Sequence, residues 1–210
     1  MKKLAVFDFD STLMDGETID FLANELGLME QVAKITEQAM AGELDFFDSL
    51  VKRVSLLKGL DEKKVNDICT NLPLINGAKE CIDTLKKNGY TVVCFSGGFR
   101  NATETICKNL GIDADFSNYL QAKNGKLTGL VGGEMMFSDS KGKMLKRLQK
   151  ILNINYNNTV VVGDGANDIS MFKYAKTRIA FCAKPILKEA ASHIVDIKDL
   201  REVAKITKKI

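Results

Sequence analysis

Short apolar runs alternate along the chain with longer segments of helical period. Four runs rich in β-branched and aromatic residues have the length of strands: 4–9, 90–95, 159–162 and 178–182. These runs are apolar on both faces, which is typical of a parallel sheet covered by helices on each side. The segments between them predict three connecting helices: 77–88, 100–110 and 142–152. The pattern therefore predicts an α/β fold built on a parallel sheet.

Two segments depart from this alternation. Between residues 15 and 73 no strand-like run occurs, and apolar residues recur at three- and four-residue intervals. This segment begins directly after the first predicted strand and ends before the second. We therefore expect a helical cap, or lid, at 15–73 over a core domain formed by 1–14 and 74–210. Between 118 and 134, Asn124-Gly125 is a type I′ turn signal that predicts a β-hairpin.

Composition and charge narrow the class of protein. The chain has 210 residues, 45% hydrophobic and 27% charged, values that fit one compact globular unit and exclude disordered and fibrous proteins. Thirty Lys and Arg against 27 Asp and Glu leave a net charge of +3, and the basic residues are scattered. This distribution gives little support for nucleic-acid or membrane binding and leaves a small charged metabolite as the expected partner. Oligomeric state is not predicted.

The cysteines and the first residues of the sequence bear on the cellular compartment that we expect for the protein. Five widely spaced cysteines include no C-x-x-C pair, so the sequence predicts neither a disulfide framework nor a structural zinc site. The first apolar run is broken at once by Asp8 and Asp10, which is unlike a signal peptide. We therefore expect a cytoplasmic protein.

Carboxylates follow two of the predicted strands at their carboxyl ends, the edge at which open α/β sheets bind ligands. Asp8 and Asp10 end the first run, and Asp164 stands between two glycines after the third. Burying adjacent carboxylates is costly unless a cation compensates, and Asp8 and Asp164 with a backbone carbonyl would suit Mg²⁺. An isolated D-x-D pair also fits a strand end closed by a turn. Asp168 is left open as a ligand, a residue supporting the ligands or a helix-end acid.

Groups suited to an oxyanion accompany these acids. Ser96 and Gly97 offer a hydroxyl and a backbone amide at a helix entrance, although a plain turn would have the same sequence. Lys141 begins a predicted helix, where a cation opposes the helix dipole, so we infer another task such as neutralising a phosphate. Arg53, on the apolar stripe of its helix, is either a snorkelling side chain or a ligand for a carboxylate. Glu17 is either a first-turn acid or a partner for an ammonium group.

In their order along the chain, these motifs resemble those of the haloacid dehalogenase superfamily. The matching stretches are Asp8-Phe9-Asp10-Ser11-Thr12, Ser96-Gly97-Gly98-Phe99, Lys141, Gly163-Asp164-Gly165-Ala166-Asn167-Asp168 and, in the expected cap, 17–20 and 52–57. The resemblance covers nearly the whole chain and implies a Rossmann-like core with a small helical cap inserted after the first strand. The nearest likeness within the superfamily is to enzymes of L-serine biosynthesis that hydrolyse O-phospho-L-serine to L-serine and phosphate with Mg²⁺.

The resemblance also implies a role for each site residue. Asp8 would attack phosphorus to form an aspartyl-phosphate, and Asp10 would protonate the leaving oxygen and then activate water. Mg²⁺ would be held by Asp8, Asp164 and the main-chain carbonyl of Asp10. Substrate contacts are implied for eight residues: Ser96, Gly97 and Lys141 at the phosphoryl oxygens, Glu17 at the ammonium, Arg53 at the carboxylate, and Asn167, Met40 and Phe46 around them.

Two other functions remain open from the sequence. A phosphotransferase would share the first half-reaction and pass the phosphoryl group to another alcohol, such as homoserine. A non-enzymatic receiver-like module would be phosphorylated on Asp8 as a signal, although Asp10 beside the aspartyl-phosphate would shorten the life of that signal. Phosphate release measured with and without acceptor alcohols separates these functions from hydrolysis.

Overall fold

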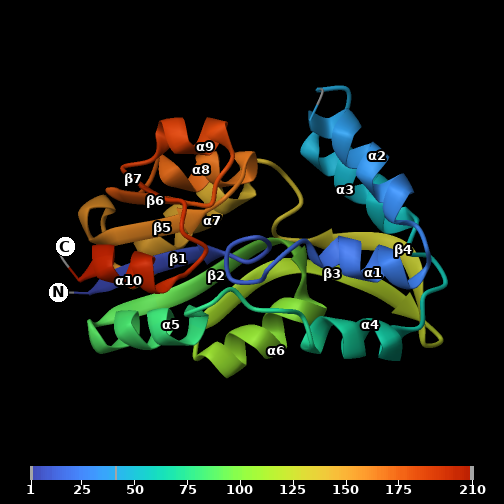
Figure 1. Ribbon diagram of the computed structural model, residues 1–210, viewed down its shortest axis with the longest axis horizontal. Coiled ribbons are helices and arrows are strands. Elements are labelled where there is room, and N and C mark those ends of the chain that lie inside the picture. The colour runs from blue at the N-terminus through green and yellow to red at the C-terminus, as the bar shows by residue number, and fades with distance from the viewer. Residues whose placement is uncertain (1, 41, 209–210) are drawn as a thin grey trace.

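Within residues 2–40 and 42–208, which the computed structural model describes, the chain folds around one seven-stranded sheet (Figure 1). The strands are β1 (Lys3–Asp8), β2 (Tyr90–Phe99), β3 (Ala114–Lys123), β4 (Lys126–Gly133), β5 (Thr159–Gly163), β6 (Thr177–Phe181) and β7 (His193–Val195). Their spatial order is β4-β3-β2-β1-β5-β6-β7, and neighbouring strands are parallel except β3 and β4. The expected α/β fold with a mostly parallel sheet is confirmed.

Helices cover both faces of the sheet (Figure 1). One face carries α5 (Ala78–Lys87), α6 (Arg100–Leu110) and α10 (Arg201–Thr207), and the other carries α7 (Ser140–Leu152), α8 (Ile169–Phe172) and α9 (Pro185–Ala190). Two short 3₁₀ turns, η1 (Tyr156–Asn158) and η2 (Ala166–Asp168), flank β5. Ala5 and Phe7 of β1 belong to the core on the first side, whereas Leu4 and Val6 belong to the second core. Burial on both faces explains why the strand sequences are apolar throughout.

Most predicted elements are present, and the differences have local causes. The hairpin is confirmed, because Asn124 and Gly125 at the β3–β4 turn have φ angles of 53° and 74°. β2 extends beyond the predicted 90–95 to Phe99, and its register against β3 shifts between Phe95 and Phe99. β7 was not predicted from the sequence, since it has only three residues and two of them are exposed.

The segment between β1 and β2 is helical, as expected. In its described residues it contains α1 (Thr18–Glu25), α2 (Met29–Met40), α3 (Phe46–Ser55) and α4 (Glu62–Thr70), which we call the helical insert. In Figure 1, α4 lies beside α6, whereas α2 and α3 stand on the other side of β4. Its division from the core as a separate lid domain stays a prediction.

The helical insert leaves and rejoins the core at one place. The amide of Asp15 donates to the Pro73 carbonyl at 2.8 Å, and the amide of Ile75 donates to the Leu13 carbonyl at 3.0 Å. Met14 and Leu74 form an antiparallel bridge between the same two stretches. The two crossings therefore pair with each other directly above the carboxyl end of β1.

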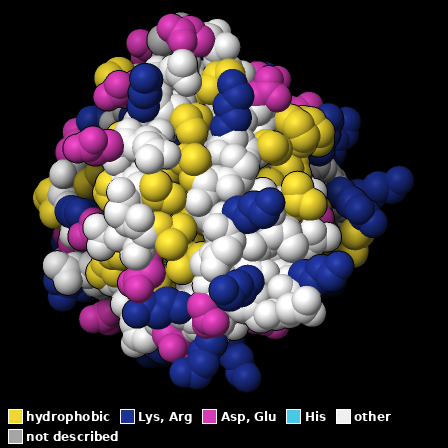
Figure 2. Space-filling view, turned by 90° about the vertical axis from the view of Figure 1, so that its right-hand side faces the viewer, with side chains coloured by type: hydrophobic (Ala, Val, Ile, Leu, Met, Phe, Trp, Pro, Cys, Tyr) yellow, Lys and Arg dark blue, Asp and Glu magenta, His cyan; other side chains and the backbone are white. Residues whose placement is uncertain are grey.

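The surface carries charges of both signs. On the face shown in Figure 2, Lys and Arg side chains are spread apart and lie among Asp and Glu side chains and small apolar patches. The basic residues form no continuous stripe on this face, in agreement with their scattered positions in the sequence. No helix of the described chain combines the length and apolarity needed to cross a membrane.

Candidate active site

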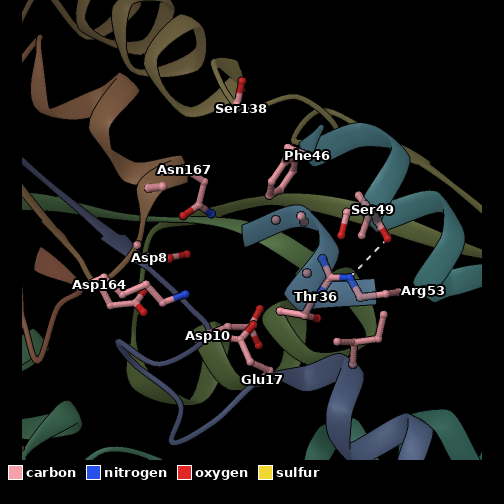
Figure 3. A pocket seen from close by; sticks show the side chains of 18 of the residues that line it. Asp8, Asp10, Glu17, Thr36, Phe46, Ser49, Arg53, Ser138, Asp164 and Asn167 are labelled. Atoms are coloured by element: carbon pink, nitrogen blue, oxygen red, sulfur yellow. Dashed lines mark hydrogen bonds between the residues drawn. The ribbon is translucent and has the colours of Figure 1, made fainter. Parts of the chain in front are cut away.

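A cavity of ≈ 770 Å³ lies between the carboxyl edge of the parallel strands and the helical insert (Figure 3). Eight of the predicted site residues line it: Asp8, Asp10, Glu17, Phe46, Arg53, Gly97, Asp164 and Asn167. Ser96 and Lys141 lie below this lining and are buried. Met40 ends α2, and its side chain lies outside the described part of the structure. The topology thus gathers residues from five separate stretches of the chain at one edge, as expected for an open α/β sheet.

Lys141 is held beneath the cavity by two carboxylates. Its Nζ lies 2.6 Å from Asp8 Oδ1 and 2.6 Å from Asp168 Oδ1, and the lysine is only 2% exposed. Burial alone would lower the pKa of Lys141, but Asp168 and Asp8 outweigh it and raise that pKa. The lysine therefore stays charged, and it fixes one oxygen of Asp8 in place. Removing one partner of such a buried pair leaves an uncompensated charge, at a cost of about 3–5 kcal/mol.

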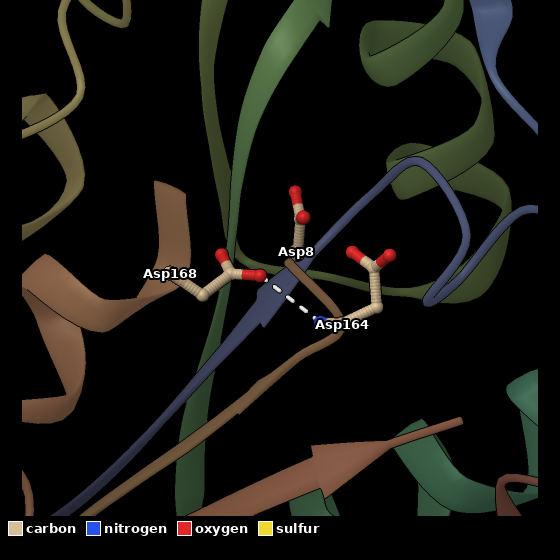
Figure 4. Close-up of side chains that lie close together, drawn as sticks. All are labelled: Asp8, Asp164 and Asp168. Atoms are coloured by element: carbon tan, nitrogen blue, oxygen red, sulfur yellow. Dashed lines mark hydrogen bonds between the residues drawn. The ribbon is translucent and has the colours of Figure 1, made fainter. Parts of the chain in front are cut away.

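Asp168 uses both of its carboxylate oxygens within the protein. Oδ1 accepts from Lys141, and Oδ2 accepts from the backbone amides of Asp164 and Gly165 at 3.0 Å each. The bond to Asp164 is the dashed line in Figure 4. A Cβ on Gly163 would lie 2.3 Å from Asp168 Oδ2, so only glycine leaves room for this packing. Of the roles left open by the sequence, these contacts favour support of the neighbouring ligands: Asp168 orders the loop that presents Asp164.

The acidic cluster has the charge and chemistry expected for a divalent cation. Asp8, Asp164 and Asp168 place one carboxylate oxygen each within 4.8 Å of one another (Figure 4). Among the described residues Lys141 is the cation in direct contact with them, so three carboxylates face one ammonium group. Burial and Asp168 raise the pKa of Asp164 to about 6, which shows the cost of ionising it there. Carboxylates are the oxygen ligands that Mg²⁺ prefers, and this set fits that ion.

Asp10 faces the cavity two residues beyond Asp8. Its Oδ1 accepts from the amide and the hydroxyl of Thr18, at 2.7 and 2.6 Å, where α1 begins. Its Oδ2 lies 3.4 Å from the hydroxyl of Ser96. Burial raises the pKa of Asp10, and the Thr18 hydrogen bonds oppose that change. A carboxyl group whose pKa is raised by burial, and whose orientation is fixed by Thr18, is suited to donate a proton.

The end of β2 brings its backbone close to these acids. The Ser96 hydroxyl accepts from the Gly98 amide at 2.9 Å. A Cβ on Gly98 would lie 2.5 Å from Asp10 Oδ2, and one on Gly97 would lie 3.0 Å from the ring of Phe46. Both glycines therefore bring the backbone of β2 close to side chains that line the cavity, most tightly where Gly98 meets Asp10.

The helical insert contributes the opposite wall. Arg53 and Ser49 of α3 lie across the cavity from Asp8 and Asp164 in Figure 3, and Arg53 Nε donates to the Ser49 carbonyl at 3.3 Å. Its terminal nitrogens have no protein acceptor among the described residues. Glu17 accepts from the Ser11 hydroxyl at 3.0 Å. Burial, with Asp10 and Asp164, raises the pKa of Glu17 to about 8.

Sequence reasoning missed several residues of the cavity wall. Asp20, Thr36, Ser49 and Lys184 all line it. Ser49 precedes Arg53 by one helical turn, and this i, i+4 spacing was the available signal. Lys184 lies in a stretch, 180–185, that shares the family resemblance, but it was given no role. Thr36 had no local signal, because only the tertiary fold places it at the cavity.

Comparisons with known proteins agree with this geometry. A family model described as haloacid dehalogenase-like hydrolase matches residues 2–176. A phosphoserine phosphatase of Wolinella succinogenes is 61% identical over 201 residues, covering 96% of this chain and 98% of that protein. Two solved structures each cover 98% of both chains: a phospho-aspartyl intermediate analogue of phosphoserine phosphatase (53% identity, TM-score 0.92) and a substrate-bound phosphoserine phosphatase complex (52%, 0.93).

Proposed function

The chain belongs to the haloacid dehalogenase-like hydrolases, and from this premise we propose how its cavity hydrolyses O-phospho-L-serine to L-serine and phosphate. One observation carries the proposal. Asp8, held from beneath by the buried Lys141, lines the same cavity as Glu17 and Arg53 of the helical insert (Figure 3). Asp8 and Lys141 suit a phosphoryl group, whereas Glu17 and Arg53 suit the ammonium and the carboxylate of an amino acid. The chain is therefore an enzyme for a substrate with these three charged groups.

Asp8 is the proposed nucleophile. Lys141 and the Phe9 amide hold its Oδ1, at 2.6 and 2.7 Å, whereas Oδ2 has no hydrogen-bond donor among the described residues. Oδ2 is thus the oxygen available to attack phosphorus and form the aspartyl-phosphate. The P–O bond to serine breaks as the new P–O bond forms, and the leaving oxygen takes the Asp10 proton. Asp10, now ionised, removes a proton from the water that hydrolyses the intermediate.

The substrate is positioned by groups around these two acids. Ser96, the Gly97 amide and Lys141 are proposed to hold the phosphoryl oxygens, where fixed donors stabilise the developing charge. Glu17 takes the ammonium and Arg53 the carboxylate. Asn167 contacts the phosphoryl group, and Phe46 and Met40 cover the bound substrate.

The proposed cofactor is Mg²⁺, held by Asp8, Asp164 and the main-chain carbonyl of Asp10. When bound, it would neutralise negative charge on the phosphoryl group. Asp168 keeps Asp164 in place through the amides of the 164–165 loop. Lys141 orients Asp8 through its contact with Oδ1.

The test is phosphate release from O-phospho-L-serine and from an aryl phosphate, with Mg²⁺ and with a chelator. We expect release from phosphoserine to depend on Mg²⁺ and its kcat/KM to exceed that of the aryl phosphate. Release should not change when homoserine or another alcohol is added. A fall in free phosphate with formation of a phosphorylated acceptor would instead indicate the phosphotransferase.

The location of the enzyme is also a proposal. The five cysteines without a paired motif support a cytoplasmic enzyme. Detection of the protein in the soluble cytoplasmic fraction, separate from periplasmic and membrane markers, is the test.

A further inference from the structure

We propose that Asn118 of β3 is a positioning residue for the phosphoryl-binding backbone of Gly97. The proposal rests on the proposed function, because it assumes that Gly97 binds the phosphoryl group. Asn118 is fully buried and does not line the cavity. It acts through the backbone of Gly97, which lines the cavity.

The amide side chain of Asn118 uses both of its ends. Nδ2 donates to the Gly97 carbonyl at 3.0 Å, and Oδ1 accepts from the Met135 amide at 3.0 Å. One partner only accepts and the other only donates, so together they fix the orientation of the side-chain amide. Ionised aspartate could accept from Met135 but could not donate to Gly97, and leucine, of similar size, could do neither.

Asn118 acts where the sheet itself does not hold β2. The pairing of β2 with β1 ends at Phe95, opposite Asp8. The register against β3 shifts between Phe95 and Phe99, and Phe99 then pairs with Asn118. The stretch between these two pairs contains Gly97, which has the conformational freedom of glycine. A side-chain hydrogen bond from the adjacent strand therefore replaces the regular pairing at the residue that meets the substrate.

The peptide between Gly97 and Gly98 is held at both ends. Asn118 binds its carbonyl oxygen, and the Ser96 hydroxyl accepts from its N–H at 2.9 Å. Since a peptide group is planar, these two bonds fix its orientation. The preceding peptide, which carries the Gly97 N–H, is joined to this fixed plane through the two dihedral angles of Gly97, so its possible directions are restricted.

The surroundings of Asn118 are built closely around it. Gly133 of β4 pairs with Asn118 and has φ of +150°. A Cβ there would lie 2.6 Å from Asn118 Cα and 2.7 Å from its Oδ1. Through Met135, Asn118 also anchors the start of the segment that leads into α7 and Lys141. One side chain thus holds the approaches to two phosphoryl-binding groups.

Asn118→Asp is the first test, because it keeps the shape and the acceptor for Met135 but removes the donor to Gly97. Full loss of an oxyanion donor lowers kcat by 10²–10³, so we expect misplacement to lower kcat/KM by roughly 10- to 100-fold. The loss should be the same for phosphoserine and for an aryl phosphate, since they share the phosphoryl group. Inhibition by vanadate should weaken by a similar factor, and the thermal midpoint should show that the variant is folded.

Ser117→Ala is the matched control. Ser117 is the neighbouring buried residue of β3, and its hydroxyl bonds to Thr103 at 2.9 Å rather than to β2. It should leave both substrates and vanadate inhibition unchanged. If Asn118→Asp does not fold, Asn118→Ala removes both hydrogen bonds without introducing a charge, and the same kinetic losses are expected.

Three results would overturn the inference: unchanged kinetics in the folded Asn118 variant, a loss confined to phosphoserine, or an equal loss in Ser117→Ala. Failure of the proposed function would look different. The wild-type enzyme would then release no phosphate from phosphoserine, whatever residue stands at 118.

Discussion

At the scale of single residues, the proposed mechanism divides the chemistry between Asp8 as nucleophile and Asp10 as acid and base. Asp8→Asn should abolish turnover, because an amide is a poor nucleophile. Asp10→Asn should still bind phosphoserine but turn over roughly 10²–10⁴-fold more slowly, the usual contribution of a positioned acid or base. Rates with leaving groups of different pKa check the assignment: Asp10→Asn should lose most with poor leaving groups. Equal losses for all leaving groups would contradict the acid role.

Glu17 should couple substrate binding to proton release. Its pKa of about 8 means that Glu17 is mostly protonated at pH 7 in the free cavity, mainly because of burial. The ammonium group of phosphoserine favours the ionised form and lowers this pKa, so binding releases a proton and strengthens as pH rises towards 8. Calorimetry of phosphoserine binding in buffers of different ionisation enthalpy, on the inactive Asp8→Asn background, measures the release. Adding Glu17→Gln should remove it, and an unchanged proton count would refute the assignment.

At the scale of elements, we expect α3 to determine which phosphate ester the core attacks. Arg53 of α3 is the proposed partner of the substrate carboxylate, so Arg53→Ala should lower kcat/KM for phosphoserine by about 10- to 150-fold, the effect of losing a charge-assisted contact of roughly 1.5–3 kcal/mol. An aryl phosphate should be almost unaffected. Arg53→Lys should rescue little, because lysine cannot present two parallel donors. Equal slowing of both substrates would mean that Arg53 acts through the folding of the insert.

A second contact joins α3 to the core outside the cavity. Phe47 stacks on Phe137 of the β4–α7 loop, with ring centroids 5.2 Å apart and planes 9° from parallel. A double-mutant cycle with Phe47→Ala and Phe137→Ala should give a coupling of about 0.5–1.5 kcal/mol in the free energy of unfolding. Both single variants should also raise KM more than they lower kcat. A coupling near zero would show that the stacked rings do not hold α3 in place.

For the whole molecule, the acidic cluster should make stability depend on Mg²⁺. Three carboxylates around one lysine repel one another in the free protein, and a bound cation stabilises the folded state. Mg²⁺ should therefore raise the thermal midpoint of the wild-type protein. Asp164→Asn should be at least as stable as wild type without Mg²⁺ and gain little when it is added. Calorimetric scans with Mg²⁺ and with chelator check this, and Asp67→Asn, on the exposed face of α4, is the control. A full Mg²⁺ shift in Asp164→Asn would exclude Asp164 as a ligand.

The sequence predicted the parts of this structure that depend on local pattern. Asp8, Asp10 and Asp164 were recognisable because polar residues at the end of an apolar strand must meet the same sheet edge. Asn118 was not, because its partners Gly97 and Met135 are 21 and 17 residues away and depend on a shift of register. The Phe47–Phe137 stack was missed for the same reason: two isolated phenylalanines have no periodicity that reveals their pairing.

The paired crossings at Asp15–Pro73 and Ile75–Leu13 have a consequence for evolution. Because both ends of the helical insert emerge side by side, a replacement of different length or shape would begin and end at the same two points. The strands of the core would not have to move to accommodate it. The entropy of closing such a loop grows only slowly with its length. Phosphoryl chemistry and substrate choice can therefore diversify separately: exchange of one contiguous gene segment would give the same hydrolytic core a new range of phosphate-ester substrates.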